Sequence, residues 1–189
     1  MKLKCFFLSV FVLGFALANA QSVVKGNKII NVGIGLGTTY YSGDFYTSSV
    51  PPLTVSMEYI FKDGVADGKG AWGIGGYFGY AAYKWEQYYH GYGSWGYSAN
   101  NVFIGPRCAF HYSFVDKLDT YGGIFLGYDV VKVKEFGTVY PGYTYIAGNS
   151  GFVWSLYVGG RYFFSEKFAG MLELGYGISY LNLGVAVKL

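Results

Sequence analysis

Alternation of apolar with small or polar residues constrains this chain more than any other feature of its sequence. In IINVGIGLGTTYY, the apolar Ile30, Val32, Ile34 and Leu36 are separated by asparagine and glycines. A period of two is typical of β-strands with one apolar and one polar face, and it recurs along the chain to predict about eight strands. The expected strands cover residues 28–41, 53–62, 71–85, 100–114, 118–131, 152–164, 168–178 and 180–189.

The low charge of the chain indicates where such strands could lie. Charged residues make up 13% of the sequence, against about 25% in ordinary soluble domains, whereas aromatic residues make up 22%. Beyond the opening residues, no apolar run approaches the roughly 20 residues that a transmembrane helix needs. A closed β-barrel is the other structure that can span a bilayer, because all its backbone groups are paired.

The connections between the expected strands alternate in length. Short or polar connections are expected near 62–70, 115–118 and 165–167, whereas the segments 42–52, 86–100 and 134–150 are long and aromatic. Outer-membrane barrels have short periplasmic turns and longer external loops. We therefore predict an all-β fold, an eight-stranded antiparallel up-and-down transmembrane β-barrel with short periplasmic turns and longer extracellular loops.

The first twenty residues, MKLKCFFLSVFVLGFALANA, have the basic start, apolar run and A-x-A ending of a secretory signal peptide. We predict that 1–20 is removed after Ala20 and that 21–189 forms a single barrel domain. Without the signal peptide the charges nearly balance, which gives no basis for nucleic-acid binding. Cys108 is then the only cysteine, which excludes a disulfide framework.

Charges within the expected strands share the register of the small and polar residues. A charge facing lipid near the bilayer centre costs about 2 to 4 kcal/mol, so these side chains should point into the lumen. There opposite charges could pair and fill an interior that is about wide enough for its own side chains. A narrow solute conduit is the alternative. The predicted lumen charge network consists of Glu58, Arg107, His111, Asp129, Arg161 and Glu173.

Two positions and one alternative fold stand outside this pattern. Lys132 and Lys134 fall on the outward register, so we expect them above the bilayer or reaching its surface. A soluble lipocalin-like barrel would use the same alternation with the apolar face inside. Its outer face should then carry many Lys and Glu residues, which the polar face of this chain lacks.

The blocks IGPRCAFHY, DTYGGIFLGYD, GGRYFFSEKFAGMLELGYG and YLNLGVAVKL resemble the outer-membrane protein beta-barrel domain family, the small OmpA/OmpX-like eight-stranded barrels. The resemblance covers the mature chain and implies a location in the outer membrane of a Gram-negative bacterium, with membrane lipid and lipopolysaccharide around it. It also implies the family's C-terminal assembly signal, read by the barrel assembly machinery, although Leu189 stands where an aromatic is usual. The residues that match this signal are Asn182, Gly184, Val187 and Leu189.

Reactive residue types occur together in NVFIGPRCAFHYSF, where His111 and Ser113 resemble the His-x-Ser arrangement of an outer-membrane lipid A deacylase. A serine nucleophile needs a neighbouring base and access to its ester. Both residues should point inward near a periplasmic turn, away from lipid A, and Cys108 should face lipid. We therefore predict no catalytic residues, no cofactor and no metal site, and keep the lipid hydrolase as the alternative function.

The aromatic external segments are the predicted functional surface, since exposed tyrosines and tryptophans are suited to binding. They could equally brace the barrel among the lipid headgroups. The function predicted from the sequence is a structural, adhesive or partner-binding role. The loop aromatics singled out are Tyr88, Tyr89, Tyr92, Trp95, Tyr140, Tyr143 and Tyr145.

Overall fold

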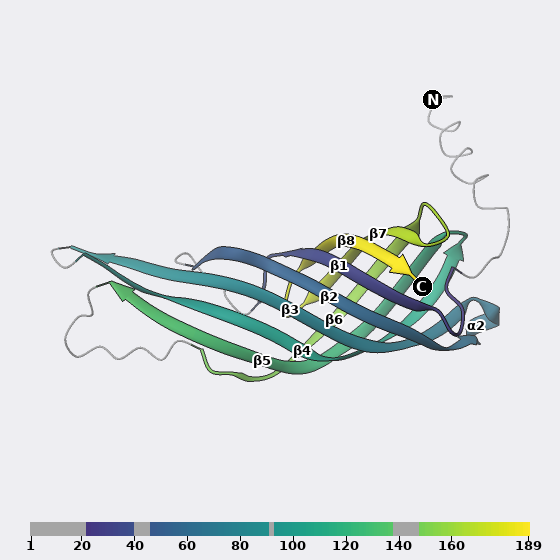
Figure 1. Ribbon diagram of the computed structural model, residues 1–189, viewed down its shortest axis with the longest axis horizontal. Helices are drawn as coiled ribbons and strands as arrows, with labels where there is room; N and C mark the ends of the chain where they lie inside the picture. Colours follow the sequence, from purple (N-terminus) through teal and green to yellow (C-terminus); the bar gives the residue numbers. More distant parts are fainter. Residues whose placement is uncertain (1–21, 40–45, 91–92, 138–147) are drawn as a thin grey trace, which may run out of the picture.

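The structure, a computed structural model, describes residues 22–39, 46–90, 93–137 and 148–189, which form a closed antiparallel barrel (Figure 1). Each strand pairs with the next along the chain, and β1 pairs with β8 to close the ring, so the predicted eight-stranded fold is confirmed. The strands are β1 (Lys28–Leu36), β2 (Tyr46–Gly64), β3 (Gly70–Tyr89), β4 (Gly93–Val115), β5 (Leu118–Gly137), β6 (Gly151–Phe163), β7 (Phe168–Tyr176) and β8 (Leu181–Lys188). Within the described ranges, no helix has the length and apolar character needed to cross a membrane.

The outer surface of the ring is apolar and the lumen is polar. Val32 on β1 is 48% exposed and pairs with Val55 and Val185 on the two neighbouring strands, both also exposed. The preceding residue, Asn31, points inward and is buried. Such an inverted distribution suits a barrel surrounded by lipid. It contradicts the soluble alternative, in which the apolar face would fill the interior.

One end of the barrel, here called the turn end, holds the C-terminus and the three connections that join β2 to β3, β4 to β5 and β6 to β7, all of them short (Figure 1). A tight turn, α2 (Val65–Gly68), joins β2 to β3, and Ala66 and Asp67 within it have left-handed backbone angles. The segment 22–27 folds into this end: the Gly26 amide donates to the Ile60 carbonyl at 2.9 Å, and the Val23 side chain is fully buried. The turn end is therefore closed by the chain itself.

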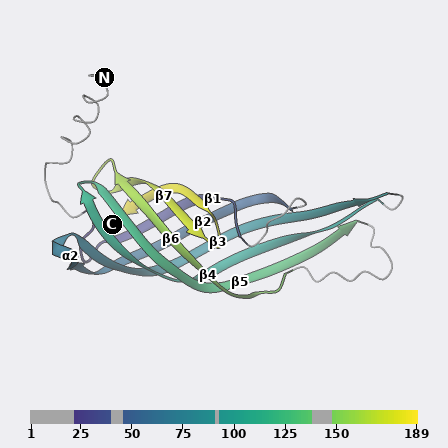
Figure 2. The same cartoon turned by 180° about the vertical axis from the view of Figure 1, so that it is seen from behind.

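The opposite end is asymmetric, because β2 to β5 continue well beyond the ring (Figures 1 and 2). These strands have 19, 20, 23 and 20 residues, whereas the other four have 8 to 13. We call the four-stranded projection the strand extension. It comprises residues 46–52, 81–89, 93–101 and 130–137.

The strand extension corrects the predicted loops. Much of 42–52, 86–100 and 134–150 was expected to be irregular, yet β3 and β4 pair without interruption up to Tyr89 and Gly93. Trp85 pairs with Tyr97 and Gln87 with Trp95, so backbone pairing persists beyond the ring. In β2, two register shifts accommodate Pro51 and Pro52 between the pairs of Ser48 and Leu53.

Substituting Leu172→Lys tests the outward apolar belt. Leu172 lies in the middle of β7 and is 47% exposed, so we expect the lysine to lower the free energy of unfolding by about 2 to 4 kcal/mol in lipid vesicles. Urea titration followed by tryptophan fluorescence measures the change. Tyr88→Lys in the strand extension is the control, with an expected loss of about 1 kcal/mol or less. Equal losses would contradict the position of the belt.

Candidate functional site

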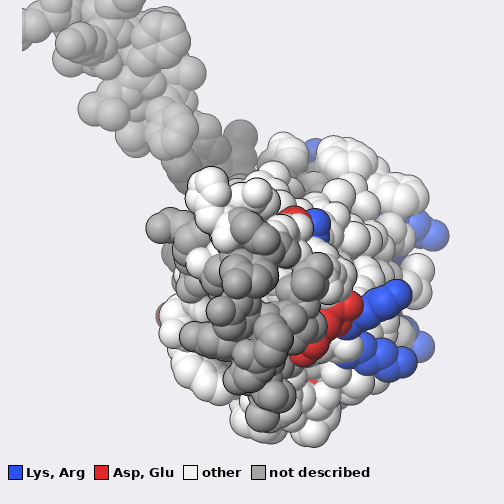
Figure 3. All heavy atoms as spheres, turned by 90° about the vertical axis from the view of Figure 1, so that its left-hand side faces the viewer, with Lys and Arg blue, Asp and Glu red and all other residues white. Residues whose placement is uncertain are grey.

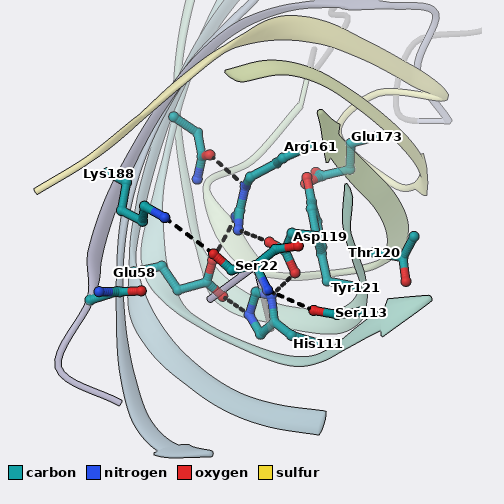
Figure 4. A network of polar contacts seen from close by, with 12 residues as sticks. Ser22, Glu58, His111, Ser113, Asp119, Thr120, Tyr121, Arg161, Glu173 and Lys188 are labelled. Carbon is teal, nitrogen blue, oxygen red and sulfur yellow. Dashed lines mark hydrogen bonds and ion pairs between the residues drawn. The ribbon is translucent and has the colours of Figure 1, made fainter. Parts of the chain in front are cut away.

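The centre of the lumen is occupied by Arg161 of β6 (Figure 4). Its Nη2 donates to Glu58 Oε2 at 2.6 Å, its Nη1 to Asp119 Oδ2 at 2.8 Å, and its Nε to Asn31 Oδ1 at 2.9 Å. Arg161 and the two carboxylates are fully buried. A buried guanidinium needs acceptors for its N–H donors. The acceptors here come from β1, β2 and β5, so one arginine on β6 links four strands of the ring.

His111 completes this cluster from β4. Its Nδ1 lies 2.9 Å from Asp119 Oδ1 and its Nε2 lies 3.1 Å from Glu58 Oε1. The ionised carboxylates can only accept hydrogen bonds, so both ring nitrogens must donate and the ring is an imidazolium. The four side chains, here called the central network, then hold two positive and two negative charges.

A second ion pair lies beside the central network. Arg107 Nη2 donates to Glu173 Oε2 at 3.0 Å, and Arg107 Nε donates to the Tyr157 hydroxyl at 3.0 Å. The Tyr121 hydroxyl donates to the same Glu173 oxygen at 3.2 Å. Each arginine also lies over an aromatic ring, Arg107 at 4.0 Å from the Tyr157 centroid and Arg161 at 4.3 Å from that of Tyr121. These cation–π contacts replace part of the hydration that burial removes.

Inward-facing glycines make room for these large side chains. A Cβ on Gly159 would lie 2.8 Å from the Tyr121 hydroxyl, and one on Gly73 would lie 2.8 Å from Glu58 Oε1. Such distances are too short for an added methyl group. Glycine at these inward positions therefore leaves the space that the large polar side chains occupy.

The predicted charge network is thus assembled with one addition and one correction. Asp119 was missed, although it has the same inward parity as Tyr121 two residues later, which was the available signal. Asp129 does not join either ion-pair group. It lies near the rim of the ring, where Asn101 Nδ2 donates to its Oδ2 at 2.6 Å.

The His111 and Ser113 pair lacks the geometry of a hydrolase. Both nitrogens of His111 face carboxylate oxygens, so the ring has no lone pair to act as a base. The Ser113 hydroxyl lies inside the turn end, where it accepts a hydrogen bond from the Ser22 amide at 3.0 Å. Lipid outside the barrel cannot reach it there, because Ser113 is only 6% exposed.

Apolar layers close the lumen on both sides of the ionic groups. At the turn end, Val23 is buried with Ile29, Ile60 and Phe163. The second buried cluster surrounds the ionic groups, where Tyr121 and Tyr157 contact Arg161 and Arg107, and continues toward the strand extension. Its members are Tyr77, Ala81, Tyr83, Phe103, Ala109, Tyr121, Phe125, Val153, Tyr157 and Ile178. The cavity beside Arg107 and Glu173 is lined in part by this cluster and has a volume of about 10 Å³, which is room for roughly one water molecule.

The C-terminal signal residues lie on the last strand and just after it. Asn182 is buried, and its Nδ2 donates to the Thr54 hydroxyl at 3.0 Å. Gly184 lies against the backbone of β1, since an added Cβ there would overlap the Val32 carbonyl. Val187 pairs with Ile30 and Phe168, and Leu189 follows the strand and is 63% exposed. Recognition by the assembly machinery stays a prediction.

The strand extension holds only part of the predicted loop aromatics. Tyr88 is 68% exposed near its tip, as expected for a contact residue. Trp95 corrects the loop prediction, because it lies in β4 with its side chain 7% exposed, 5.6 Å from the ring of Trp85. Inward parity in a paired strand, rather than a loop, explains that burial. The remaining predictions lie outside the described residues: Tyr92, Tyr140, Tyr143, Tyr145 and the side chain of Tyr89.

A basic row lies on the outward face of the strand extension, formed by Lys84, Lys132 and Lys134. Ser98 pairs with Lys84 on one side and Lys134 on the other, and Lys132 follows beside Asn100. Lys84 also forms an ion pair with Glu86 at 2.6 Å. Seen from this end of the molecule, positive side chains gather on one flank next to acidic ones (Figure 3).

Removing the central cation tests how far the fold depends on the central network. Arg161→Met leaves Glu58 and Asp119 without their arginine, and we expect a loss of about 3 to 5 kcal/mol in the free energy of unfolding. Urea titration in detergent micelles measures it. The control is Lys62→Met, an exposed residue at the turn end, with little expected effect. A loss below about 1 kcal/mol for Arg161→Met would show that the network is dispensable.

This chain resembles known proteins in structure rather than in sequence. No protein-family model matches the chain, and no curated protein sequence matches it. Among solved structures, the outer-membrane protein OprG of Pseudomonas aeruginosa is 13% identical, with 90% of this chain and 99% of OprG covered and a TM-score of 0.54.

Two further structures are less similar. Ail, the attachment invasion locus protein of Yersinia pestis, is 11% identical over 87% of this chain and 96% of Ail, with a TM-score of 0.47. The N-terminal barrel of Pseudomonas aeruginosa OprF is 14% identical over 88% of this chain and 98% of that one, with a TM-score of 0.43. The likeness to OprG shows the fold: the chain is a small eight-stranded β-barrel of the outer-membrane type.

Proposed function

We propose that this protein is a closed outer-membrane barrel that holds the strand extension at the cell surface, in a structural, adhesive or partner-binding role. The observation that carries the proposal is the strand extension, because four strands continue past the ring while the lumen below them is filled. The barrel acts as an anchor, and the extension is the part that meets the surroundings.

The membrane position follows from the dimensions of the short strands. The strands β1, β7 and β8 have 9, 9 and 8 residues, close to the roughly 9 to 11 that a tilted strand needs to cross the hydrocarbon layer. Short connections face the periplasm in such barrels, so the turn end lies there and the strand extension lies outside. Removal of the signal peptide after Ala20 would leave a new N-terminus next to Ser22, at the turn end.

The filled lumen supports a role without transport or catalysis. Solutes would have to pass both buried clusters and the ion pairs, and the cavity beside Arg107 and Glu173 holds roughly one water molecule. The hydrolase alternative lacks a free base beside Ser113. The solute conduit would require the central network to separate, which leaves buried charges unpaired at high cost.

The basic row suggests which part of the membrane the extension contacts. Lys84, Lys132 and Lys134 face outward just beyond the apolar belt, where the phosphates of lipopolysaccharide would lie outside the hydrocarbon. Opposite charge attracts each lysine to an anionic surface by about 1 kcal/mol. We propose that the row holds the extension against lipopolysaccharide, leaving Tyr88 and the neighbouring aromatic segments for other partners.

The closed lumen is tested by conductance. Protein refolded into planar lipid bilayers, with folding checked by heat-modifiable gel migration, should show no discrete channel openings above the bare membrane. The expected reason is that the ionic layer and both apolar layers persist in the bilayer. Stable single-channel steps would support the solute conduit and overturn the closed-barrel proposal.

The lipid contact is tested by neutralising the basic row. The triple variant Lys84→Gln, Lys132→Gln and Lys134→Gln should retain several-fold less lipopolysaccharide than the unaltered protein after purification from outer membranes in mild detergent, because the attraction to phosphate is lost.

A matched control removes the same number of positive charges at the other end of the barrel. Lys25, Lys62 and Lys167 are exposed at the turn end, and changing all three to Gln should leave lipopolysaccharide retention unchanged. An equal loss of lipopolysaccharide retention in both triple variants would contradict the proposed orientation.

A further inference from the structure

A groove crosses the outer wall of the barrel near the turn end, over β4 to β7. This outer groove has a volume of about 380 Å³, which falls within the roughly 300 to 1,000 Å³ of small-molecule sites. Its lining is predominantly apolar and includes Phe110, Tyr112, Val158, Leu172 and Leu174. These side chains have outward parity, so the outer groove opens toward lipid and is separate from the central network inside the barrel.

The strand register explains why the wall is hollow at this place. Outward residues of β4 to β7 form two rows across the sheet, each with large residues on β4 and β7 and a small residue between them. The first row is Phe110, Gly122, Val158 and Leu174, and the second, nearer the turn end, is Tyr112, Thr120, Gly160 and Leu172. The strands β5 and β6 therefore form the floor of the outer groove, while β4 and β7 form its walls.

The glycines of the floor are not required by packing within the barrel. A Cβ on Gly122 would lie 3.5 Å from its nearest neighbour, Val158 Cγ1, and a Cβ on Gly160 would lie 3.8 Å from its nearest neighbours. These are ordinary contact distances, in contrast to those at the inward-facing Gly159 and Gly73. Larger side chains would fit at both floor positions, so the hollow is not a consequence of how the ring packs.

The chemistry of the outer groove suits a hydrocarbon chain. The one side-chain polar atom of its floor, Thr120 Oγ1, donates a hydrogen bond to the Tyr112 carbonyl. The walls are aromatic and aliphatic side chains. Because the outer groove lies in the apolar belt, the material that covers it is lipid, and an acyl chain seated there would gain contacts with both walls.

The depth of the outer groove selects one leaflet of the membrane. Gly122 lies four residues after Leu118, the first residue of β5. Four residues of strand span about 13 Å, which is less than half of the roughly 30 Å hydrocarbon layer. The outer groove thus lies in the leaflet at the turn end. In the proposed function this is the periplasmic leaflet, which consists of phospholipid; that assignment rests on the proposed orientation, whereas binding in detergent does not.

Charged residues stand where the headgroup of such a lipid would lie. Lys117 and Lys167 are exposed in the two connections that frame the outer groove, between β4 and β5 and between β6 and β7. Each follows an acidic residue, Asp116 or Glu166. Lysines attract phosphate and carboxylates attract ammonium, so this pattern complements a zwitterionic headgroup. We propose that the outer groove binds one acyl chain of a phosphatidylethanolamine molecule, with the phosphate beside Lys117 and Lys167.

Native mass spectrometry of the refolded protein released from detergent micelles tests this site. The protein is titrated with dimyristoylphosphatidylethanolamine and separately with dimyristoylglycerol, which has the same chains without the phosphate and ammonium. We expect one phosphatidylethanolamine molecule to bind saturably to each barrel. The dimyristoylglycerol should bind several-fold more weakly, because it lacks the charges that meet the lysines.

Filling the floor tests the position of the acyl chain. Gly122→Leu should weaken phosphatidylethanolamine binding by at least about tenfold, because the chain loses its buried contacts with the floor. Gly76→Leu is the matched control. Gly76 is an outward glycine of β3, outside the outer groove, where an added Cβ would meet no atom within 4 Å, so this change should leave binding unaltered.

Neutralising the two lysines tests the position of the headgroup. The double variant Lys117→Gln and Lys167→Gln should bind phosphatidylethanolamine several-fold more weakly. Lys25→Gln with Lys62→Gln removes the same number of charges elsewhere at the turn end and should have no effect. Heat-modifiable migration confirms that each variant is folded before it is titrated.

Four results would overturn the proposal. They are adducts that increase without saturation, equal binding of the two lipids, equal effects of Gly122→Leu and Gly76→Leu, and unchanged binding in the Lys117 and Lys167 variant. A barrel dimer that Gly122→Leu abolishes would also overturn it, since the outer groove would then bind a second copy of the chain. None of these results bears on the closed lumen or the lipopolysaccharide contact, which are measured by conductance and by lipopolysaccharide retention.

Discussion

The rest of the barrel depends on the buried contact between Arg161 and the carboxylates of Glu58 and Asp119. With His111 it links β2, β4, β5 and β6 across the lumen, and no member of the central network is more than 1% exposed. Buried ion pairs often add little net stability over a well-packed apolar core, but removing one partner leaves an unpaired charge. Their role here is to fix which side chains face inward, since a slip of any of these four strands by one residue would turn a charge toward lipid.

A filled lumen has consequences for the whole molecule. The ionic groups, the apolar layers at both ends and the segment 22–27 leave little space inside the ring. In the proposed function the barrel is therefore a rigid support rather than a passage, and the strand extension is the part that meets the surroundings. Its inward face is closed by stacked aromatics such as Trp85 and Tyr97, while its outward face carries the basic row. The proposed contact surface thus lies outside the membrane-spanning ring.

The sequence predicted the ring well because one rule, the inward or outward parity of each residue, is enforced by lipid at every strand. That rule placed Glu58, Arg107, Arg161 and Glu173 correctly, and it also applies to the overlooked Asp119. It could not tell which inward charges lie at the same depth, because depth depends on the stagger between strands. Asp129 was therefore grouped with charges that it does not reach.

Beyond the ring, lipid no longer imposes that rule, and the sequence was less informative. Glycine- and tyrosine-rich segments are typical of loops, but here backbone pairing continues and buries Trp95.

The lumen is held by a charge-balanced network in which His111 is the second cation. The most direct measurement is ¹⁵N NMR of the His111 ring in the refolded protein at neutral pH. The account predicts a proton on both ring nitrogens, whereas a ring with one unprotonated nitrogen would contradict it.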